Sequence, residues 1–308
     1  MIQQFTATDT EDNLRLGVFL AEQLGISRSQ AQKLIKGGLV KVNNEEMIKP
    51  SVKVVDGDVV VVKEELQVAG SKLQVPDLNI LFENTDVLVI NKPSDLLVHR
   101  TMPEDTSPTL VDALLKHDPG IAGVGDDPEE RPGIVHRLDK NASGVLVVAK
   151  TREAFEHLKQ QFATRAAKKE YTALVYGKVG QDAGEINFRI GRSKRSGKMV
   201  AKPEGSEEGK EAITTFDVVQ RNATTTLLRV RIKTGRTHQI RAHMLAYDHP
   251  IVGDPLYKKR VMTNIRPIEL DRLFLHAAKL TITLPNGEMK TFEAPLPEKL
   301  EQLLTKLS

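Results

Sequence analysis

The sequence predicts an α+β protein in which a small N-terminal module precedes a larger domain with a central mixed or antiparallel sheet. The chain has 308 residues, which is long for one compact domain and favours two. After residue 79, short apolar runs typical of strands dominate, and helical patterns separate them irregularly. An irregular order of strands and helices favours the α+β class over a parallel sheet with strictly alternating helices.

Changes of pattern along the chain predict three segments. Residues 1–64 are predicted to form the N-terminal module, and residues 80–308 the larger domain. Residues 65–79 are predicted to be a linker, because they lack strong periodicity and include the turn-forming Gly70 and Pro76.

The N-terminal module is predicted to contain two helices and a small sheet. Apolar residues recur at helical spacing over residues 14–24. A second helix begins at Arg28 and is stopped at Gly37. Short strands follow at residues 39–42 and 59–62, next to turn-forming residues.

The larger domain is predicted to be rich in strands. Apolar runs predict strands over residues 87–90, 145–149, 171–176, 227–232 and 280–284. Helices are predicted over residues 109–116, 152–164 and 238–246.

The composition excludes several kinds of protein and site. The chain has no Cys, which excludes disulfides, Cys-based zinc sites and thiol catalysis. No apolar run approaches the ~20 residues that cross a bilayer, and the first twelve residues lack the pattern of a signal peptide. We therefore expect a cytoplasmic protein without membrane contact, and we expect a monomer.

The positive charge is concentrated in two segments. The net charge is only +3, but residues 186–203 and residues 221–243 each contain six basic residues and no acidic one. Such segregation on a nearly neutral chain predicts a surface that binds a polyanion, with RNA or DNA as the expected partner.

A polar loop before an apolar strand carries the first candidate catalytic residue. In the segment from Arg131 to Val148, Asp139 lies between Arg137 and Lys140. Nearby positive charge favours an ionised carboxylate, which can act as a nucleophile or a base. An alternative of nearly equal weight is that Asp139 caps a turn and its basic neighbours are solvated.

Two further segments carry polar residues that need an explanation. Residues 233–243 open with a glycine turn and continue as a helix that includes Arg241. A buried Arg241 needs an acidic partner, because burying a lone charge is costly. The segment contains no acid, so the partner must come from elsewhere, and Asp139 is a candidate. Tyr171 opens a strand directly after two basic residues, where core packing is the default interpretation.

The patterns of common metal and phosphate sites are broken. His238 and His243 are five residues apart without a Glu between them, and this spacing does not place two imidazoles on one helix face for zinc. The glycines of residues 191–198 miss the spacing of a phosphate-binding loop. We expect no metal.

The N-terminal module resembles the S4 (αL-type) RNA-binding domain. The matching features are Arg15-Leu16, Ser27 to Ala31, Ile35, Gly38 to Asn43 and Asp56 to Asp58. A small packing domain with ordinary surface charge is the alternative. The residues expected to contact RNA are Arg15, Arg28, Lys33, Lys36 and Lys41 of this module and Arg192, Lys194 and Arg195 of the first basic segment.

The larger domain resembles the RluA type of RNA pseudouridine synthase. The matching segments are Asn91 to Pro93, His136 to Asp139 followed by Ser143-Gly144, Lys169 to Tyr171, Gly235 to His243 and His249 to Pro255. Five matches in the family's order are far more specific than one. Together with the S4-like module they make the chain similar to the large-subunit ribosomal RNA enzymes of the RluC/RluD kind. The departures at Asp95, Arg100 and Ala142 remove no catalytic group.

This resemblance implies an enzyme that isomerises uridine in RNA to pseudouridine without a cofactor or metal. It implies that Asp139 is the catalytic carboxylate, that Arg241 pairs with it, and that Tyr171 stacks on the target uracil and helps to remove the C5 proton. Residues implied to flip the uridine or to position the site are Arg137, His136, Lys92, Arg236 and His238.

The expected substrate is large-subunit ribosomal RNA, and the pre-ribosomal large subunit is a candidate partner. A tRNA target, and a non-catalytic RNA-binding or ribosome-assembly factor on the same fold, are the alternatives. An RNA hydrolase that uses Asp139 with His136 would need a second acid or a metal, which these motifs do not supply.

Overall fold

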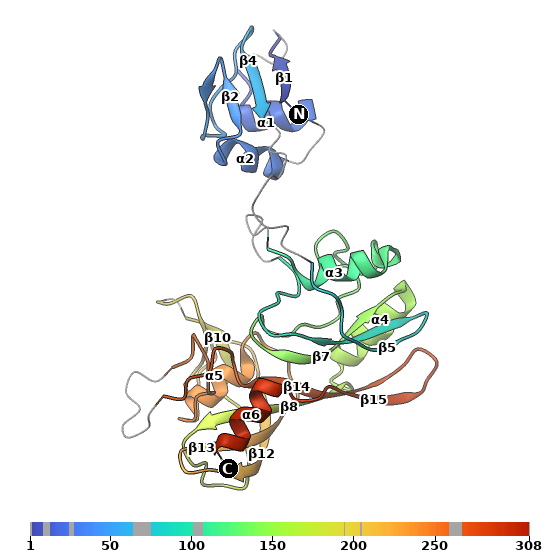
Figure 1. The fold of residues 1–308 in the computed structure, drawn as a ribbon, viewed down its shortest axis with the longest axis vertical. Coiled ribbons are helices and arrows are strands. Elements are labelled where there is room, and N and C mark those ends of the chain that lie inside the picture. Colours follow the sequence, from blue (N-terminus) through green and yellow to red (C-terminus); the bar gives the residue numbers. More distant parts are fainter. Residues whose placement is uncertain are drawn as a thin grey trace. The chain divides into compact units, whose positions relative to one another are not determined.

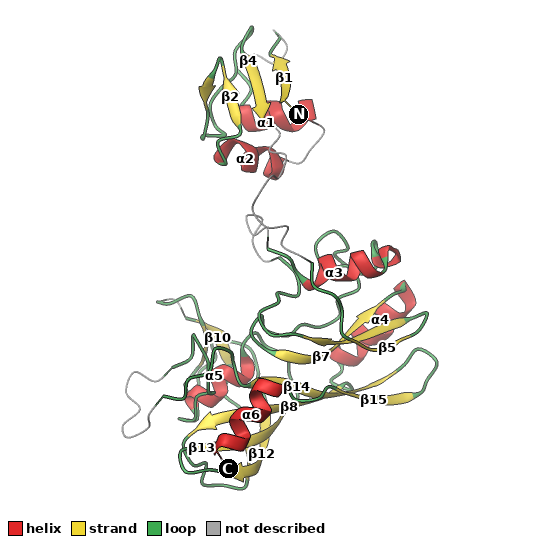
Figure 2. Cartoon of the chain, in the orientation of Figure 1, coloured by secondary structure: helices red, strands yellow, loops and turns green. Residues whose placement is uncertain are grey.

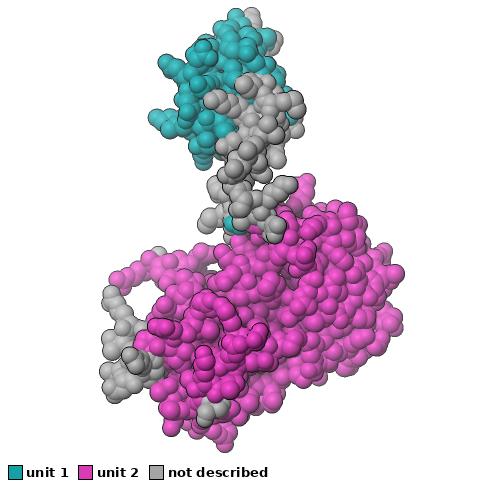
Figure 3. Space-filling view, in the orientation of Figure 1, with its two compact units in different colours: residues 1–74, 101–107 teal, residues 75–100, 108–308 magenta. Residues whose placement is uncertain are grey.

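A computed structural model describes residues 2–8, 13–24, 28–63, 75–100, 107–193, 195–203, 205–258 and 267–307. The chain divides into two compact units, residues 1–74 with 101–107 and residues 75–100 with 108–308 (Figure 3). Most of the predicted linker, residues 65–79, lies outside the described residues. None of the described helices is long and apolar enough to span a membrane.

The first unit combines a small antiparallel sheet with two helices, α1 (Leu16–Leu24) and α2 (Arg28–Lys36) (Figure 1). Its described strands follow the order β1 (Ile2–Thr6), β4 (Val59–Lys63), β2 (Val40–Val42) and β3 (Glu45–Glu46). Its core contains the buried side chains of Phe19, Leu20, Ile35, Val40 and Val60. The two helices and the strands near residues 40 and 60 confirm the sequence prediction, whereas β1 and β3 were not predicted.

The second unit is built on a mixed sheet with nine strands among the described residues (Figure 2). The strand order is β5 (Ile80–Glu83), β6 (Val87–Lys92), β7 (Ser143–Ala149), β14 (Leu275–Thr283), β8 (Lys168–Tyr176), β13 (Thr225–Ile232), β12 (Thr214–Arg221) and β9 (Ala183–Ile186), and β15 (Met289–Glu293) also pairs with β14. The β7–β14 pair is parallel and the other pairs are antiparallel. A separate hairpin joins β10 (Ile190–Arg192) to β11 (Met199–Ala201). The predicted α+β class with a mixed sheet is confirmed.

The described α-helices of the second unit are α3 (Leu110–His117), α4 (Arg152–Ala163), α5 (Gln239–Ala246) and α6 (Glu298–Leu307). Two of them, α3 and α4, begin at a threonine cap. Thr109 and Asp112 form a capping box at the start of α3, and the Thr151 hydroxyl accepts a hydrogen bond from the backbone N–H of Ala154 at the start of α4. Such caps satisfy backbone donors that the helix itself leaves unpaired.

The central strands are apolar on both faces because two cores sandwich them. In β7, Leu146 and Val148 point into one core, whereas Val145 and Val147 point into the other. Helices α3 and α6 cover the first core, and α4 covers the second (Figure 1). This two-sided burial explains the uninterrupted apolar run, since successive residues of a strand alternate between faces.

Two strands begin earlier than their apolar runs suggest. Strand β14 begins at Leu275 and β8 at Lys168, and the two pair with each other, with Lys168 opposite Thr281. Polar residues whose sequence does not predict a strand therefore become part of these strands because they pair with the neighbouring strand. Strand β12 and helix α6 were not predicted either. Strand β12 is largely exposed in its second half, where periodicity is weak.

We expect Gly144→Ala to destabilise the protein by roughly 2–4 kcal/mol. Gly144 has φ +118° and lies in β7 directly opposite Ala277 of β14, so an added Cβ would overlap the backbone of Ala277. Gly123→Ala is the matched control, because Gly123 has φ +90° but open space around its Cα. Urea unfolding of both variants measures the difference. Equal losses of stability would contradict the close approach of β7 and β14 as the reason for the glycine.

Candidate active site

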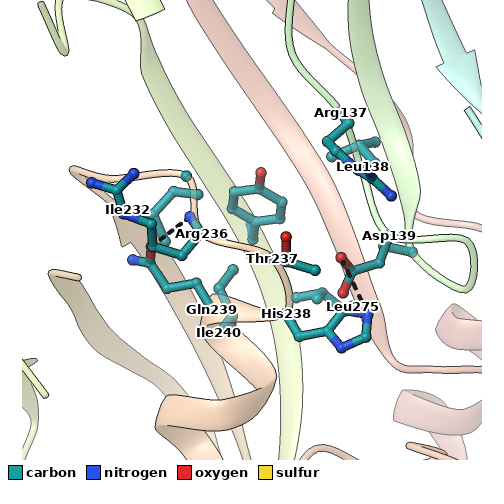
Figure 4. Close-up of a pocket in the computed structure, with 13 residues that line it drawn as sticks. Arg137, Leu138, Asp139, Ile232, Arg236, Thr237, His238, Gln239, Ile240 and Leu275 are labelled. Carbon is teal, nitrogen blue, oxygen red and sulfur yellow. Dashed lines mark hydrogen bonds and ion pairs between the residues drawn. The ribbon is translucent and has the colours of Figure 1, made fainter. Parts of the chain in front are cut away.

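A pocket opens where the loop before β7 faces the turn before α5 (Figure 4). Arg137 to Asp139 come from the loop, and Gly235 to Ile240 come from the turn and the first residues of α5. Tyr171 of β8, Ile232 of β13 and Leu275 of β14 add side chains from the sheet. The pocket therefore combines one carboxylate, several basic groups and an apolar surface.

Asp139 is held at one oxygen and open at the other. Its Oδ2 accepts a hydrogen bond of 3.2 Å from Nη1 of Arg241. Its Oδ1 lies 4.0 Å from Nε2 of His238, beyond a hydrogen bond, and receives no hydrogen bond from the described part of the chain. The side chain of Asp139 is 17% exposed, so Oδ1 is available to a group that enters the pocket.

Arg241 is buried and has a second, closer acidic partner. Its Nε and Nη2 donate to the two carboxylate oxygens of Asp254 at 2.7 and 2.8 Å. The side chains of Arg241 and Asp254 are each only 1% exposed. Burial alone would lower the pKa of Arg241, but its hydrogen bonds and ion pairs with Asp254 and Asp139 outweigh burial and raise it. Arg241 therefore stays charged and fixes the orientation of Asp139.

The loop that carries Asp139 is anchored from two sides. On one side, the buried ammonium of Lys92 donates to the backbone oxygens of Pro93, Leu96 and Lys140, at 2.6, 2.9 and 3.2 Å. On the other side, Nε2 of His136 accepts a hydrogen bond of 3.1 Å from the backbone N–H of Val147.

His136 and Lys92 do not line the pocket. The ring of His136 stacks on Phe162 of α4, with centroids 4.4 Å apart. Burial lowers the pKa of His136 to about 3, so this ring is neutral. Burial lowers the pKa of Lys92 to about 7, against the attraction of Asp139 and Asp95. Neither residue touches the pocket, and both support the loop that carries Asp139.

Tyr171 reaches the pocket from the middle of the sheet. It lies opposite Val230 of β13 and Ala277 of β14, and it is 7% exposed. Burial, together with the negative charge of Asp139, raises the pKa of the Tyr171 hydroxyl, which therefore keeps its proton at neutral pH. The aromatic ring is held by a rigid strand, so its position relative to Asp139 is fixed.

The turn before α5 is supported by a buried amide. Oε1 of Gln239 accepts from the Thr234 hydroxyl at 2.7 Å and from the backbone N–H of Arg236 at 3.0 Å. Its Nε2 donates to the backbone oxygen of Ile213 and to the Thr214 hydroxyl, each at 3.0 Å. The guanidinium of Arg236 donates to the backbone oxygen of Glu211 at 3.0 Å. These bonds fix the segment that faces Asp139.

The expected RNA-contacting residues lie in two places. In the first unit, the exposed side chains of Arg15 and Lys36 line one depression between α1 and α2, and Lys41 is half-buried on β2. In the second unit, Arg192 and Arg195 are exposed on the β10–β11 hairpin. Lys194 and the side chains of Arg28 and Lys33 lie outside the described part of the structure.

The structure brings together most of the site residues predicted from the sequence. Asp139, Tyr171, Arg137, Arg236 and His238 line one pocket, with Arg241 directly behind it.

The predicted pairing of Arg241 with Asp139 is present, but sequence reasoning missed Asp254 as the main partner. Asp254 lies only 13 residues after Arg241. The sequence signal that could have identified Asp254 is that the His249 to Pro255 segment contains an acid in addition to Asp139. Sequence reasoning also missed Tyr257, whose ring centroid lies 4.9 Å from the guanidinium carbon of Arg241.

Two protein families match the chain in the order of its two units. Residues 14–60 match the S4 domain, and residues 86–246 match the family described as RNA pseudouridylate synthase. The second match spans the loop of Asp139, the strand of Tyr171 and the helix of Arg241.

Curated relatives are similar along nearly the whole chain. An uncharacterized RNA pseudouridine synthase of Bacillus subtilis, YlyB, is 38% identical over 305 residues, which cover 98% of this chain and 97% of the relative. Ribosomal large subunit pseudouridine synthase D of Escherichia coli is 37% identical over 320 residues, covering 98% and 93%. Among solved structures, human RNA pseudouridylate synthase domain containing 1 superposes with a TM-score of 0.58 at 27% identity, covering 78% of this chain and 97% of that one.

Proposed function

The chain belongs to the RNA pseudouridylate synthase family, and from this premise we propose that it isomerises particular uridines of large-subunit ribosomal RNA with Asp139 as the catalytic carboxylate. The geometry of Asp139 carries the proposal. One of its oxygens is held by a buried arginine, and the other faces a pocket. A preorganised carboxylate of this kind can react without first being reoriented.

The reaction needs little beyond such a carboxylate. The bond between N1 of uracil and C1′ of ribose breaks, the base turns, and C5 bonds to C1′ while the C5 proton leaves and N1 takes up a proton. Product and substrate are isomers, so no oxidant, reductant or energy source is consumed. Asp139 acts either by attacking C1′ as a nucleophile or by removing the 2′ proton as a base.

The other pocket residues have complementary roles in this proposal. The ring of Tyr171 stacks on the uracil, and its hydroxyl takes part in removing the C5 proton by relaying it, passing its own proton on to a second acceptor. The target must leave the base stack to reach a recessed carboxylate, and the exposed Arg137 at the pocket fills the space that the uridine vacates. Arg241 keeps Asp139 oriented, while Lys92 and His136 hold the loop in place.

The ribosomal target rests on the relatives and on the distribution of charge. Relatives of 36–38% identity include several named as ribosomal large subunit pseudouridine synthase D. Arg15, Lys36 and the exposed arginines of the β10–β11 hairpin supply cations for the phosphate backbone, which dominates affinity for nucleic acids. We propose that these residues bind the RNA around the target uridine, on free ribosomal RNA or on the pre-ribosomal large subunit.

Mapping pseudouridine in cells tests the target. Ribosomal RNA and tRNA from cells with and without the protein are compared, and cells that carry Asp139→Asn serve as the catalytic control. We expect sites in large-subunit ribosomal RNA to disappear in the deletion and in Asp139→Asn cells. Loss of sites in tRNA alone would contradict the ribosomal target while leaving the isomerase activity intact.

We expect Tyr171→Phe to bind RNA nearly as well as the wild type but to turn over roughly 10²-fold or more slowly. The ring remains available for stacking, whereas the hydroxyl that handles the C5 proton is lost. Tyr176→Phe is the control, because Tyr176 lies on the same strand but its hydroxyl accepts from the backbone N–H of Ile268. Single-turnover rates and RNA binding are measured on one transcript. Wild-type turnover in Tyr171→Phe would assign the C5 proton to another group.

A further inference from the structure

His238 presents its two ring nitrogens to two different partners. It precedes α5 with a left-handed backbone, φ 54° and ψ 26°, and its side chain lies beside Asp139 (Figure 4). Nε2 lies 4.0 Å from Oδ1 of Asp139. Nδ1 lies 3.0 Å from the hydroxyl oxygen of Tyr257. Which ring nitrogen carries the proton therefore determines whether Nε2 of His238 is a hydrogen-bond donor or an acceptor toward the pocket.

The Tyr257 hydroxyl determines where that proton lies. It donates its single hydrogen to the backbone oxygen of Met199 at 2.8 Å, and a carbonyl oxygen can only accept. Burial raises the pKa of Tyr257 to about 12, so the hydroxyl keeps this hydrogen. Toward His238 the hydroxyl oxygen can then only accept, which requires the proton on Nδ1.

His238 is uncharged in this arrangement. Burial and the nearby guanidinium of Arg241 lower the pKa of His238, although Asp139 and Asp254 raise it, and the net shift is downward. A neutral ring with its proton on Nδ1 has a bare lone pair on Nε2. The pocket therefore holds two adjacent acceptors, Nε2 of His238 and Oδ1 of Asp139.

We propose that Tyr257 is a positioning residue that fixes His238 in the tautomer whose bare Nε2 accepts a hydrogen bond from the bound nucleotide. The opposite tautomer would turn a donor toward Oδ1 of Asp139, the oxygen that faces the substrate. The donor from the nucleotide is a ribose hydroxyl or a base N–H. This inference rests on the proposed function, because it assigns His238 and Tyr257 to the same reaction.

Tyr257 is itself held by the ion pair behind the pocket. Its backbone N–H donates to Oδ1 of Asp254 at 3.0 Å, and its ring lies against Arg241. The residue is 2% exposed and packs in a cluster with Ile190 and Ala242. All of these contacts involve the backbone or the ring, so removing the hydroxyl alone leaves them in place.

Tyr257→Phe tests the proposal with little change in packing. We expect kcat/KM for pseudouridine formation to fall roughly 10- to 100-fold, the loss typical when the hydrogen-bond partner that fixes the tautomer of a metal-bound histidine is removed. The melting temperature should stay near that of the wild type. Tyr247→Phe is the matched control, because the Tyr247 hydroxyl makes a long 3.4 Å hydrogen bond to exposed Gln181. Wild-type activity in Tyr257→Phe would overturn the proposal.

A double-mutant cycle separates positioning from packing. His238→Asn keeps a donor near the Nδ1 position and removes the Nε2 acceptor, and asparagine tolerates the left-handed backbone. We expect Tyr257→Phe to cause no further loss of activity in the His238→Asn background, since both changes remove the same acceptor. Losses that multiply would show that Tyr257 acts independently of His238, contrary to the proposal.

A spectroscopic readout keeps this inference separate from the proposed function. In protein labelled with ¹⁵N-histidine, the His238 signals are those missing from His238→Asn. We expect the wild type at pH 7 to show the Nδ1–H tautomer and Tyr257→Phe to shift toward Nε2–H. A wild-type ring that is protonated, or that has Nε2–H, would overturn the proposal. This result does not depend on turnover, so an inactive wild-type protein would refute the proposed function alone.

Discussion

Asp139→Asn is expected to abolish pseudouridine formation, by a factor on the order of 10⁴ or more, while the protein still folds and binds RNA. The amide has nearly the shape of the carboxylate but is neither a nucleophile nor a base. The fold survives because Arg241 keeps its two hydrogen bonds to Asp254. No buried cation is left unpaired, so we expect the free energy of unfolding to change by at most about 1–2 kcal/mol.

The matched control for this variant is Asp127→Asn. Asp127 is an exposed carboxylate nearby in the chain, paired with Arg131 at 3.4 Å, and it does not line the pocket. Turnover, RNA binding and urea unfolding are measured for both variants. Residual turnover near the wild-type rate in Asp139→Asn would remove Asp139 from the chemistry. An unfolded variant would show instead that Asp254 alone does not stabilise Arg241.

Asp254→Asn is expected to lower the free energy of unfolding by about 3–5 kcal/mol and to reduce turnover strongly. The carboxylate of Asp254 accepts hydrogen bonds from two nitrogens of Arg241 and from the backbone N–H groups of Leu256 and Tyr257. The amide of asparagine has no negative charge. Its NH2 group would also point a hydrogen-bond donor at the N–H donors of Arg241 or of the backbone. Arg241 would keep its single bond to partly exposed Asp139 and at most one bond to the neutral amide oxygen, so the buried charge is poorly compensated.

A surface ion pair provides the comparison for Asp254→Asn. Asp217 pairs with Arg231 on neighbouring strands, and both side chains are more than a third exposed, at 39% and 46%. Exposed ion pairs contribute about 0–1 kcal/mol, so Asp217→Asn should cost little. Urea unfolding of the two variants gives the difference directly. Similar losses would refute the claim that the buried Arg241–Asp254 pair is the structural support of the site.

The helices and strands that could be predicted from the sequence are of two kinds. They are strands buried on both faces, which give continuous apolar runs, and helices that begin at a capping residue. Strands β6 and β7 lie between two cores and show as continuous apolar runs. Helices α3 and α4 have threonine caps and apolar faces. The first residues of β8 depend on pairing with β14, which is distant in the chain, and such pairing leaves no local pattern. The second half of β12 pairs with the next strand, β13, but it is largely exposed and so has weak periodicity. The domain boundaries near residue 64 remain a prediction, because residues 64–74 lie outside the described structure.

Site residues could be predicted where they lie in recognisable sequence segments. Contacts between residues that are brought together only by the fold were harder to predict. Asp139, Tyr171 and Arg241 come from three separate segments, and the resemblance of these segments to the RluA type implied that they meet. Asp254 was missed because a charge partner is selected by distance in space, although its place in the His249 to Pro255 segment was a usable sequence signal. His136 precedes Arg137 directly, yet it stacks on Phe162 and does not line the pocket.

Release of tritium from RNA labelled at C5 of uridine tests the central claim most directly, because only a reaction that replaces the C5–H bond liberates this label. Purified wild-type protein and Asp139→Asn are compared on a large-subunit ribosomal RNA transcript. We predict one tritium released for each pseudouridine formed by the wild type, and none above background for Asp139→Asn. RNA binding without tritium release by the wild type, or equal release by both proteins, would contradict the account.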